Sequence, residues 1–155
     1  MDFSLTSDQK MMQDALARTL GEAATLDRVR RFADDPTDRG ADVWAALVDF
    51  GLPGVVIPEE YGGLGLKLLD AALASEVLGR AVAPVPFLGA VLAPLALQIA
   101  GTREQQAEWL PRLASGEVTA AVAISEAVAG ARDGAGVSAS GGRLNGKALF
   151  VPGGL

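Results

Sequence analysis

The chain has 155 residues, half of them hydrophobic and 21% charged, a balance typical of a globular protein with room for one domain and part of another. Its net charge of −6 offers no basic surface to a phosphate backbone, so we expect no nucleic-acid partner. The absence of cysteine and histidine excludes disulfides, thiol nucleophiles, Cys/His metal sites and serine–histidine triads. A carboxylate cation site stays open in principle, but no calcium-loop spacing occurs and we predict no metal site.

Two segments bear on location. The first four residues lack the cationic and apolar run of a signal peptide, and we expect a cytoplasmic protein. Residues 81–100 carry no charge over a length that could cross a bilayer. Prolines interrupt this segment, and only the part from Phe87 onward has a helical pattern. We therefore predict a buried core helix there and no membrane span.

Residues 1–116 have the pattern of helices with capping signals. Thr6 to Gln9 form a capping box, in which a hydroxyl and an amide satisfy the free N–H groups at a helix start. Leu16 and Leu20 continue an apolar stripe of period four from Met12. Gly51 is expected to end a helix with positive φ. Six helices are predicted. The first starts at the Thr6 box, the next four cover Leu26–Phe32, Asp42–Phe50, Leu66–Leu78 and Phe87–Ile99, and the sixth runs from a second capping box, Thr102–Gln105, to about Ala114. The side chains predicted to face inward are Val43, Trp44, Leu47 and Val48 in the third helix and Leu69, Leu73 and Val77 in the fourth.

After Gly116 the pattern becomes that of strands. Val118–Ile124 suits a buried strand, and Val137–Ser140 and Leu144–Val151 suit two more, joined by a Gly141-Gly142 hairpin. The fold class is thus α+β, with an all-α domain over residues 1–116 and the incomplete start of a β-domain over 117–155. Because so few strands would leave an unpaired edge, we expect a fragment or truncated product.

Three motifs have both a functional and a structural interpretation. The residues from Gly141 to Lys147 match part of a phosphate-binding loop, but Ala148 lacks the hydroxyl and a strand follows, so we favour a hairpin. The adjacent Glu59 and Glu60 could be a catalytic pair only if one were desolvated, and a glycine-rich loop favours a structural role. Ser125-Glu126, taken alone, is typical of a strand end whose side chains satisfy a turn.

The order of the whole set resembles a known family. It resembles the acyl-CoA dehydrogenases in five segments. In chain order these are an opening F-x-L-T-x-x-Q, a tryptophan helix leading into G-L-x-G-x-x-I-P-E-E-Y-G-G-x-G, the segment A-G-T-R-E-Q-Q-A-E-W-L-P-R-L-A-S-G-E, a strand ending in S-E, and a later L-N-G-K-A-L-F-V-P. The resemblance covers essentially the entire chain. It implies an N-terminal helical domain followed by the first strands of a barrel-like middle domain.

The resemblance also implies a flavin site. In this family FAD accepts the β-hydrogen of an acyl-CoA thioester as hydride, while a carboxylate removes the α-proton. Carried over to this sequence, Val122 and Ile124 would line the flavin ring, and Ser125 would replace the threonine that hydrogen-bonds near flavin N5 and O4. Three departures put FAD binding by this piece in doubt: Ala127 for proline, Ala131 for serine and Arg132 for aspartate.

The acyl tail of the family's substrates enters among the N-terminal helices. The helix at Phe87–Ile99 would supply the pocket floor, with Leu88, Gly89 and Leu92 along the tail, although simple core packing explains each of them equally well. Gly89 would leave space for the tail. The family's catalytic glutamate belongs to a C-terminal domain outside these residues, so we assign no catalytic residue and expect no turnover by this chain alone.

The leading hypothesis is therefore part of a FAD-dependent oxidoreductase of fatty-acid or other lipid metabolism. Its partners would be an acyl-CoA, an electron-transfer acceptor and further subunits, since the family assembles as homo- or hetero-oligomers, usually tetramers. One alternative is a non-catalytic subunit or domain of a heteromeric dehydrogenase. Another is a helical interaction module that has lost the cofactor.

Overall fold

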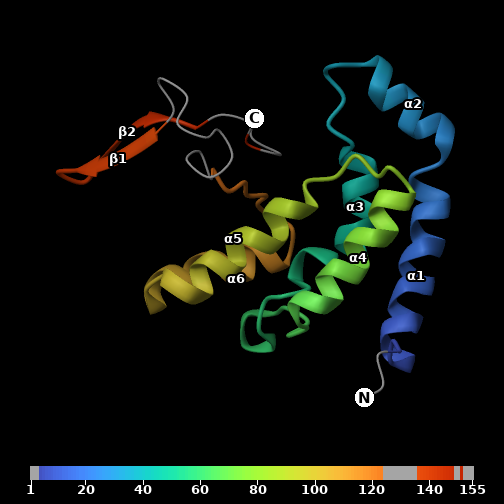
Figure 1. Cartoon of the computed structure of the whole chain (residues 1–155), viewed down its shortest axis with the longest axis horizontal. Coiled ribbons are helices and arrows are strands. Elements are labelled where there is room, and N and C mark those ends of the chain that lie inside the picture. Colours follow the sequence, from blue (N-terminus) through green and yellow to red (C-terminus); the bar gives the residue numbers. More distant parts are fainter. Residues whose placement is uncertain (1–3, 124–135, 149–150, 152–155) are drawn as a thin grey trace.

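The structure, a computed structural model, describes residues 4–123, 136–148 and 151. It contains a helical body and a separate two-stranded antiparallel hairpin (Figure 1). The elements are α1 (Ser7–Ala23), α2 (Leu26–Asp34), α3 (Ala41–Asp49), the 3₁₀ turns η1 (Leu52–Gly54) and η2 (Glu59–Tyr61), α4 (Leu68–Arg80), α5 (Phe87–Ala100), α6 (Arg103–Ala114), β1 (Gly136–Ser140) and β2 (Arg143–Lys147).

Both predicted capping boxes are confirmed. The N–H of Gln9 donates to Thr6 Oγ1 at 3.2 Å, and the N–H of Thr6 donates back to Gln9 Oε1 at 3.0 Å. Thr102 and Gln105 form the same reciprocal pair at the start of α6, at 3.3 and 2.9 Å. Gly51 ends the third helix with φ of 84°, as expected. Such local hydrogen bonds explain why these boundaries are legible in the sequence.

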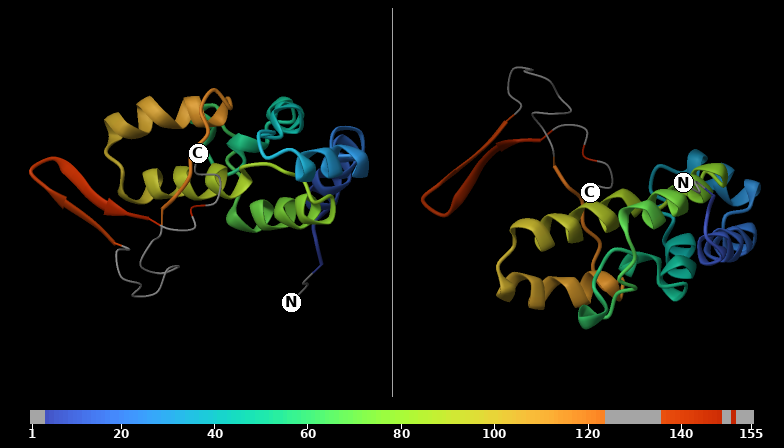
Figure 2. Two further views of the ribbon diagram at one scale, coloured as in Figure 1. Left: turned by 90° about the horizontal axis from the view of Figure 1, so that it is seen from above. Right: turned by 60° about the horizontal axis from the view of Figure 1, so that its bottom comes forward.

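The core lies where α1, α3, α4 and α5 meet. Its largest fully buried side chains include Leu16, Leu20, Val43, Leu47 and Leu52, each worth roughly 1.5–3 kcal/mol on burial. α1 lies beside α4, and α5 runs antiparallel to α6, as Figures 1 and 2 show. A smaller cluster of Ile57, Leu110 and Leu113 fixes α6 against the loop after α3.

The inward face of α4 differs from the prediction. The helix begins at Leu68 because the N–H of Lys67 donates to the Asp70 carboxylate at 2.9 Å, which satisfies the first turn. Leu69 is 58% exposed, although it was predicted to face inward. Val77 is buried as predicted and Leu73 is partly buried, while the rest of the buried face consists of Ala71, Ala74 and Leu78. The buried face of α4 therefore combines two alanines with Val77 and Leu78.

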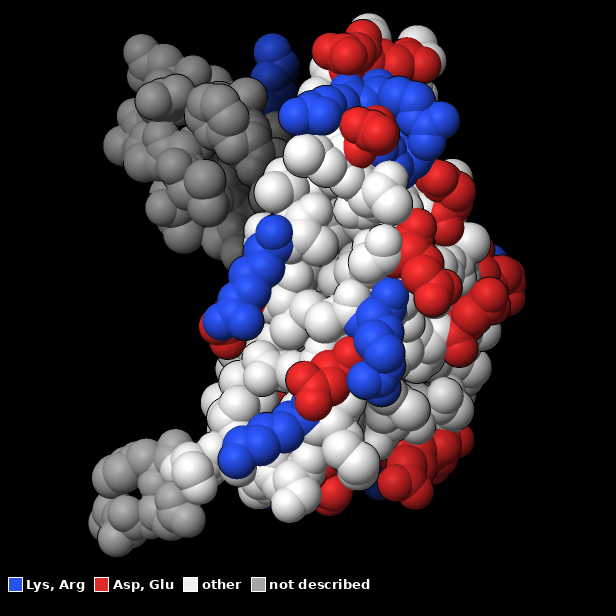
Figure 3. All heavy atoms as spheres, turned by 90° about the vertical axis from the view of Figure 1, so that its right-hand side faces the viewer, with Lys and Arg blue, Asp and Glu red and all other residues white. Residues whose placement is uncertain are grey.

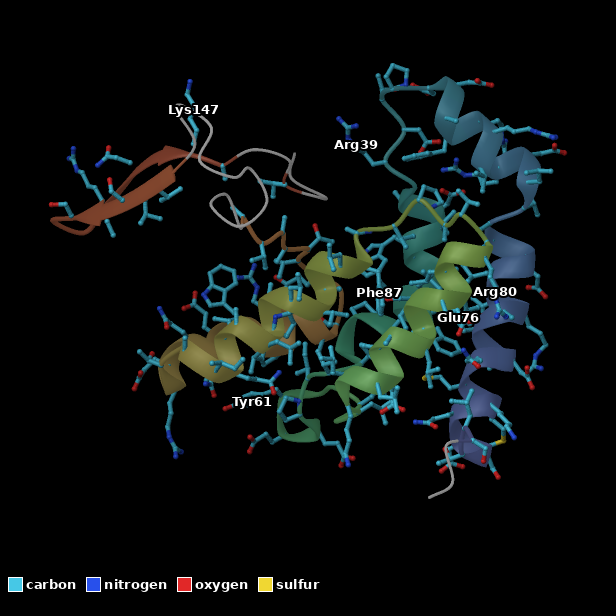
Figure 4. All side chains as sticks on the ribbon, in the orientation of Figure 1. Arg39, Tyr61, Glu76, Arg80, Phe87 and Lys147 are labelled. Atoms are coloured by element: carbon cyan, nitrogen blue, oxygen red, sulfur yellow. The ribbon has the colours of Figure 1, made fainter. Side chains whose placement is uncertain are left out.

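The side of the molecule formed by α1, α2 and α4 carries interspersed acidic and basic side chains (Figure 3). One exposed pair, Glu76 with Arg80, joins successive turns of α4 (Figure 4). α1 and α4 are also tied by the Gln9 amide, which donates to Asp70 at 3.0 Å. The pairing of α1 with α4 therefore rests on apolar burial with a few polar contacts at its edge.

α5 is the buried helix predicted over Phe87–Ile99, one residue longer. Phe87, Ala90, Val91 and Pro94 are buried, and Figure 4 shows Phe87 at the start of the helix. None of the helices in the described ranges is long and apolar enough to cross a membrane. In the same ranges no cluster of three or more histidine, cysteine, aspartate or glutamate side chains is placed to hold a metal.

The predicted strand at Val118–Ile124 is wrong over its described part. Residues 118–123 have no strand pairing, and Val118 and Ala120 instead pack beside the Ile57 cluster. An apolar run of this length indicates burial but does not identify a strand partner. Ile124 lies outside the described residues.

The hairpin prediction is confirmed. β1 and β2 pair in antiparallel register, from Ser140 opposite Arg143 to Gly136 opposite Lys147. The turn residues Gly141 and Gly142 have φ of 58° and 73°, the positive values of a two-residue hairpin turn. The second strand ends at Lys147 and does not continue to Val151 as predicted. The phosphate-loop interpretation therefore fails here, since the segment is a strand and no helix follows within the described residues.

Candidate functional site

A cavity lies at the start of α5 in the described part of the chain. It has a volume of about 520 Å³ and a mostly apolar wall. Its lining comes from α2 and the following loop (Phe32, Asp38, Arg39), α3 (Ala41, Trp44), the strap between α4 and α5 (Ala83, Pro84, Val85, Pro86), α5 (Leu88, Gly89) and Thr119. An apolar cavity with a few polar groups on its wall is the form that small-molecule sites take.

An ion-pair cluster around the buried Arg28 holds the α2–α3 loop in place beside this cavity. The Arg28 guanidinium, from α2, donates to Asp42 at 2.7 Å through Nε and to Asp38 at 2.9 Å through Nη2. These hydrogen bonds lower the pKa of the Asp42 carboxyl to about 2. They also lower the pKa of Asp38, helped by the N–H of Gly40, and raise the pKa of Arg28. The three charges therefore stay ionised together and fix the loop.

A glycine then lets the strap approach α3. Gly40 has φ of 63°, and a Cβ there would lie 2.2 Å from the carbonyl oxygen of Pro84. Only glycine permits both this backbone conformation and this contact. The α2–α3 loop and the strap thereby form two adjoining walls of the cavity.

The strap itself begins with a strained residue. Val82 has φ of 49°, a left-handed conformation that is unfavourable for a β-branched side chain. A second cavity of about 610 Å³ lies along the strap and shares five lining residues with the first, Phe32, Ala83, Pro84, Val85 and Leu88. Both cavities therefore depend on the path that the strap takes between α4 and α5.

Two of the three predicted acyl-tail residues line the cavity. Leu88 is 53% exposed and lines both cavities, and Gly89 lines the first. Leu92 lies one turn further along α5, is partly buried and is not in the cavity wall. The idea that Gly89 leaves space for the tail needs correction, because its Cβ position lies 1.7 Å from the carbonyl oxygen of Ala120. That space is taken by the chain itself.

Of the predicted flavin residues, the structure describes only Val122. It is partly buried and lies three residues after Thr119, which lines the cavity. Ile124 and Ser125 lie outside the described residues, as do the departures at Ala127, Ala131 and Arg132.

The loop with Glu59 and Glu60 exposes both residues to solvent. Backbone hydrogen bonds close this loop, for example the one that the N–H of Gly65 donates to the carbonyl oxygen of Ile57 at 2.8 Å.

Sequence reasoning did not single out the polar residues around the cavity. Arg28 is 8% exposed, and its partners Asp38 and Asp42 lie ten and fourteen positions later. The signal was an arginine on the inner side of a short helix, followed by one aspartate in the loop and one in the first turn of the next helix. Arg39 and Trp44 also line the cavity, and Trp44 was predicted only as an inward-facing residue.

The described residues form a six-helix domain with an open, mostly apolar cavity at the start of its fifth helix, followed by a β-hairpin. Residues 6–117 match the family described as "Acyl-CoA dehydrogenase, N-terminal domain". The chain therefore belongs to the acyl-CoA dehydrogenase family.

Relatives of known name agree with this assignment. The chain is 38% identical over 120 residues to "Acyl-CoA dehydrogenase IpdE2" of Mycobacterium tuberculosis, covering 76% of this chain and 36% of the relative. It is 35% identical over 130 residues to the mitochondrial isovaleryl-CoA dehydrogenase of Solanum tuberosum, covering 79% and 30%. The chain thus spans about a third of the length of the curated relatives it matches.

Solved structures share the fold. A variant of the Tcur3481–Tcur3483 steroid ACAD matches with a TM-score of 0.77 and 32% identity, covering 93% of this chain and 41% of that one. The ChsE4–ChsE5 complex from Mycobacterium tuberculosis matches with a TM-score of 0.66 and 30% identity, covering 84% and 33%. An acyl-CoA dehydrogenase from Bacillus anthracis, complexed with FAD, matches with a TM-score of 0.63 and 30% identity, covering 79% and 22%.

Proposed function

We propose that this chain supplies the acyl pocket and part of the flavin wall of a FAD-dependent acyl-CoA dehydrogenase, without its catalytic base. The observation that carries the proposal is the cavity at the start of α5. Leu88 and Gly89, expected from the family resemblance to lie along the acyl tail, line that cavity. Thr119 in the same wall leads within three residues to Val122, the first expected flavin contact.

The chemistry divides accordingly. Bound FAD would accept the β-hydrogen of the acyl group. The chain's own residues would hold the acyl tail against α5, exclude water from it and cover one side of the flavin with Val122 and Ile124. Ser125 would donate a hydrogen bond to the flavin and so tune its electronics. Leu92, one turn away from the cavity, would meet only the end of a long tail.

The test uses Trp44 as a reporter inside the cavity wall. Trp109→Phe removes the other tryptophan, which is 38% exposed on α6, and keeps an aromatic ring under Arg112. Titration of the full chain with octanoyl-CoA should change the Trp44 emission and reach saturation. Leu88→Gln should weaken this binding, because a polar amide would replace apolar lining.

Ile99→Gln is the matched control. Ile99 also lies on α5, is 84% exposed and does not line either cavity. Binding should be unchanged in that variant. No saturable change with octanoyl-CoA, or equal weakening by both substitutions, would refute the proposed pocket.

A second candidate function is a non-catalytic subunit of a heteromeric dehydrogenase. It is favoured by the departures at Ala131 and Arg132, and by the fact that two of the structural relatives are described as pairs of different chains. Gel filtration of the full chain with FAD tests it. This candidate predicts no retained flavin in the natural chain and more retention after Ala131→Ser with Arg132→Asp. Retention of FAD by the natural chain would exclude it.

A further inference from the structure

The wall of the acyl cavity contains a cation that no carboxylate neutralises. Arg39 lines the cavity and projects from the loop between α2 and α3 (Figure 4). In the described part of the chain its guanidinium forms no ion pair, and the hydrogen bond that it donates goes to the carbonyl oxygen of Pro36 at 3.2 Å. A purely hydrocarbon ligand would gain nothing from such a group.

The neighbouring acid, Asp38, does not compensate Arg39. Its carboxylate oxygens are already held by Arg28, at 2.7 and 2.9 Å, and one of them accepts the N–H of Gly40 at 2.8 Å. Arg28 is in turn shared with Asp42. Asp38 is therefore occupied by Arg28, and most donors of the exposed Arg39 stay open to solvent or to a ligand. An arginine presents five N–H donors in a fixed plane, suited to carbonyl and carboxylate oxygens.

A second donor in the same wall also lacks an acceptor. The indole of Trp44 lines the cavity, and its Nε1–H is shielded from solvent without a hydrogen-bond partner in the described structure. A buried donor left without an acceptor is unfavourable, and native proteins satisfy most such groups. A ligand oxygen that enters as the indole shifts would satisfy it. The buried Trp44 donor therefore calls for an oxygen acceptor, and Arg39, which is exposed to solvent, can offer further donors to the same oxygen.

We propose that the acyl group taken by this cavity carries a hydrogen-bond-accepting oxygen in addition to its thioester, as a ketone or a carboxylate. Arg39 binds that oxygen, and Trp44 is a second donor to it. This inference rests on the proposed function, since it names the class of acyl group that the pocket selects. The two adjoining cavities provide room for a branched or cyclic acyl skeleton around the oxygen.

The test compares three thioesters of equal chain length by titration calorimetry on the full chain: octanoyl-CoA, 7-oxooctanoyl-CoA and the mono-CoA thioester of octanedioic acid. At least one oxygen-bearing ligand should bind about tenfold more tightly than octanoyl-CoA, the effect of one hydrogen bond to a charged group. A preference for the ketone identifies a carbonyl acceptor, and a preference for the diacid identifies a carboxylate. Arg39→Gln should abolish the preference, and Trp44→Phe should reduce it.

Two controls separate other roles of the charge. Arg31→Gln removes the same charge from exposed α2 outside both cavities and should preserve the preference. Free coenzyme A should bind the Arg39→Gln variant as it binds the natural chain. A drop in that affinity would mean that Arg39 holds a coenzyme A phosphate, which would overturn the inference.

The outcomes distinguish this inference from the proposed function. Equal affinity for all three thioesters, or a preference that survives Arg39→Gln, overturns the inference and leaves the acyl pocket intact. No binding of any thioester by the folded chain overturns the pocket itself, and the inference with it. Circular dichroism of each variant verifies that the helical domain is folded.

Discussion

Gly89→Ala should destabilise the chain relative to the same substitution at other helical glycines. In a helix interior, alanine is more stable than glycine by about 0.8–1.0 kcal/mol. At Gly89 the new methyl would lie 1.7 Å from the carbonyl oxygen of Ala120 and 2.8 Å from its carbon. These are backbone atoms, so α5 or residues 119–123 must move. Overpacking of this kind costs about 1–3 kcal/mol, which cancels or exceeds the gain in helix propensity.

Gly21 in α1 and Gly79 in α4 are matched controls. A Cβ at either position would meet no atom within 4 Å, so Gly21→Ala and Gly79→Ala should each stabilise the chain by about 0.8–1.0 kcal/mol. The three variants are compared by urea unfolding followed by circular dichroism. Gly89→Ala should lie below both controls by about 1–3 kcal/mol, a gap of roughly 4 °C or more in Tm for a domain of this size.

Relief of the clash could also occur by release of the segment after α6. In that case amide hydrogen exchange at residues 119–123 would accelerate while global stability changed little. A Gly89→Ala variant as stable as Gly21→Ala, with unchanged exchange in that segment, would refute the close packing of α5 against Ala120. It would also reopen Gly89 as space for the acyl tail.

Three further predictions concern the stability of the helical domain. Because Arg28 lowers the folded-state pKa of Asp38 and of Asp42, the latter from 3.8 to about 2, stability should be full above pH 4 and fall as the pH drops toward 2. Arg28→Met should lower Tm at pH 7 and flatten this acid dependence in thermal scans; an unchanged acid profile would contradict the cluster. Thr102→Ala should cost about 0.5–2 kcal/mol through loss of the α6 cap, with Thr102→Ser as a conservative control, and equal unfolding midpoints would contradict that role. Val82→Gly should stabilise the chain by up to about 1 kcal/mol by relieving strain, a gain that a destabilised variant would disprove.

The local parts of this fold could be predicted from sequence. The boxes at Thr6 and Thr102 and the turn at Gly141 are closed by residues within a few positions of each other, so their chemistry is complete in the sequence. The apolar run at α5 correctly predicted a helix with a buried face, although Leu88 and Ile99 on it are exposed. The family resemblance also depends on short motifs that are complete within the sequence.

The parts that depend on distant neighbours could not be predicted. Leu69 matched the helical period, but it is 58% exposed, and the buried residues of α4 are Ala71, Ala74, Val77 and Leu78. Residues 118–123 have strand composition, yet they pack beside α6 and have no strand pairing. The sequence predicts free space beside Gly89, because it does not show that the backbone of Ala120 lies against this glycine. The cavity combines α2, α3, the strap and α5, so its polar donors became visible only in three dimensions.

Photolabelling tests the central claim most directly, because it locates the acyl tail on the chain. An acyl-CoA with a diazirine at the end of its tail is irradiated with the full chain, and the labelled peptides are sequenced by mass spectrometry. The acyl-pocket account predicts labels on the strap and the start of α5, within residues 83–89, or on the facing wall from Phe32 to Trp44. Excess octanoyl-CoA should suppress them. Labels concentrated on α1 or on the outer face of α6, with residues 83–89 unmarked, would contradict the assignment of this cavity to the acyl group.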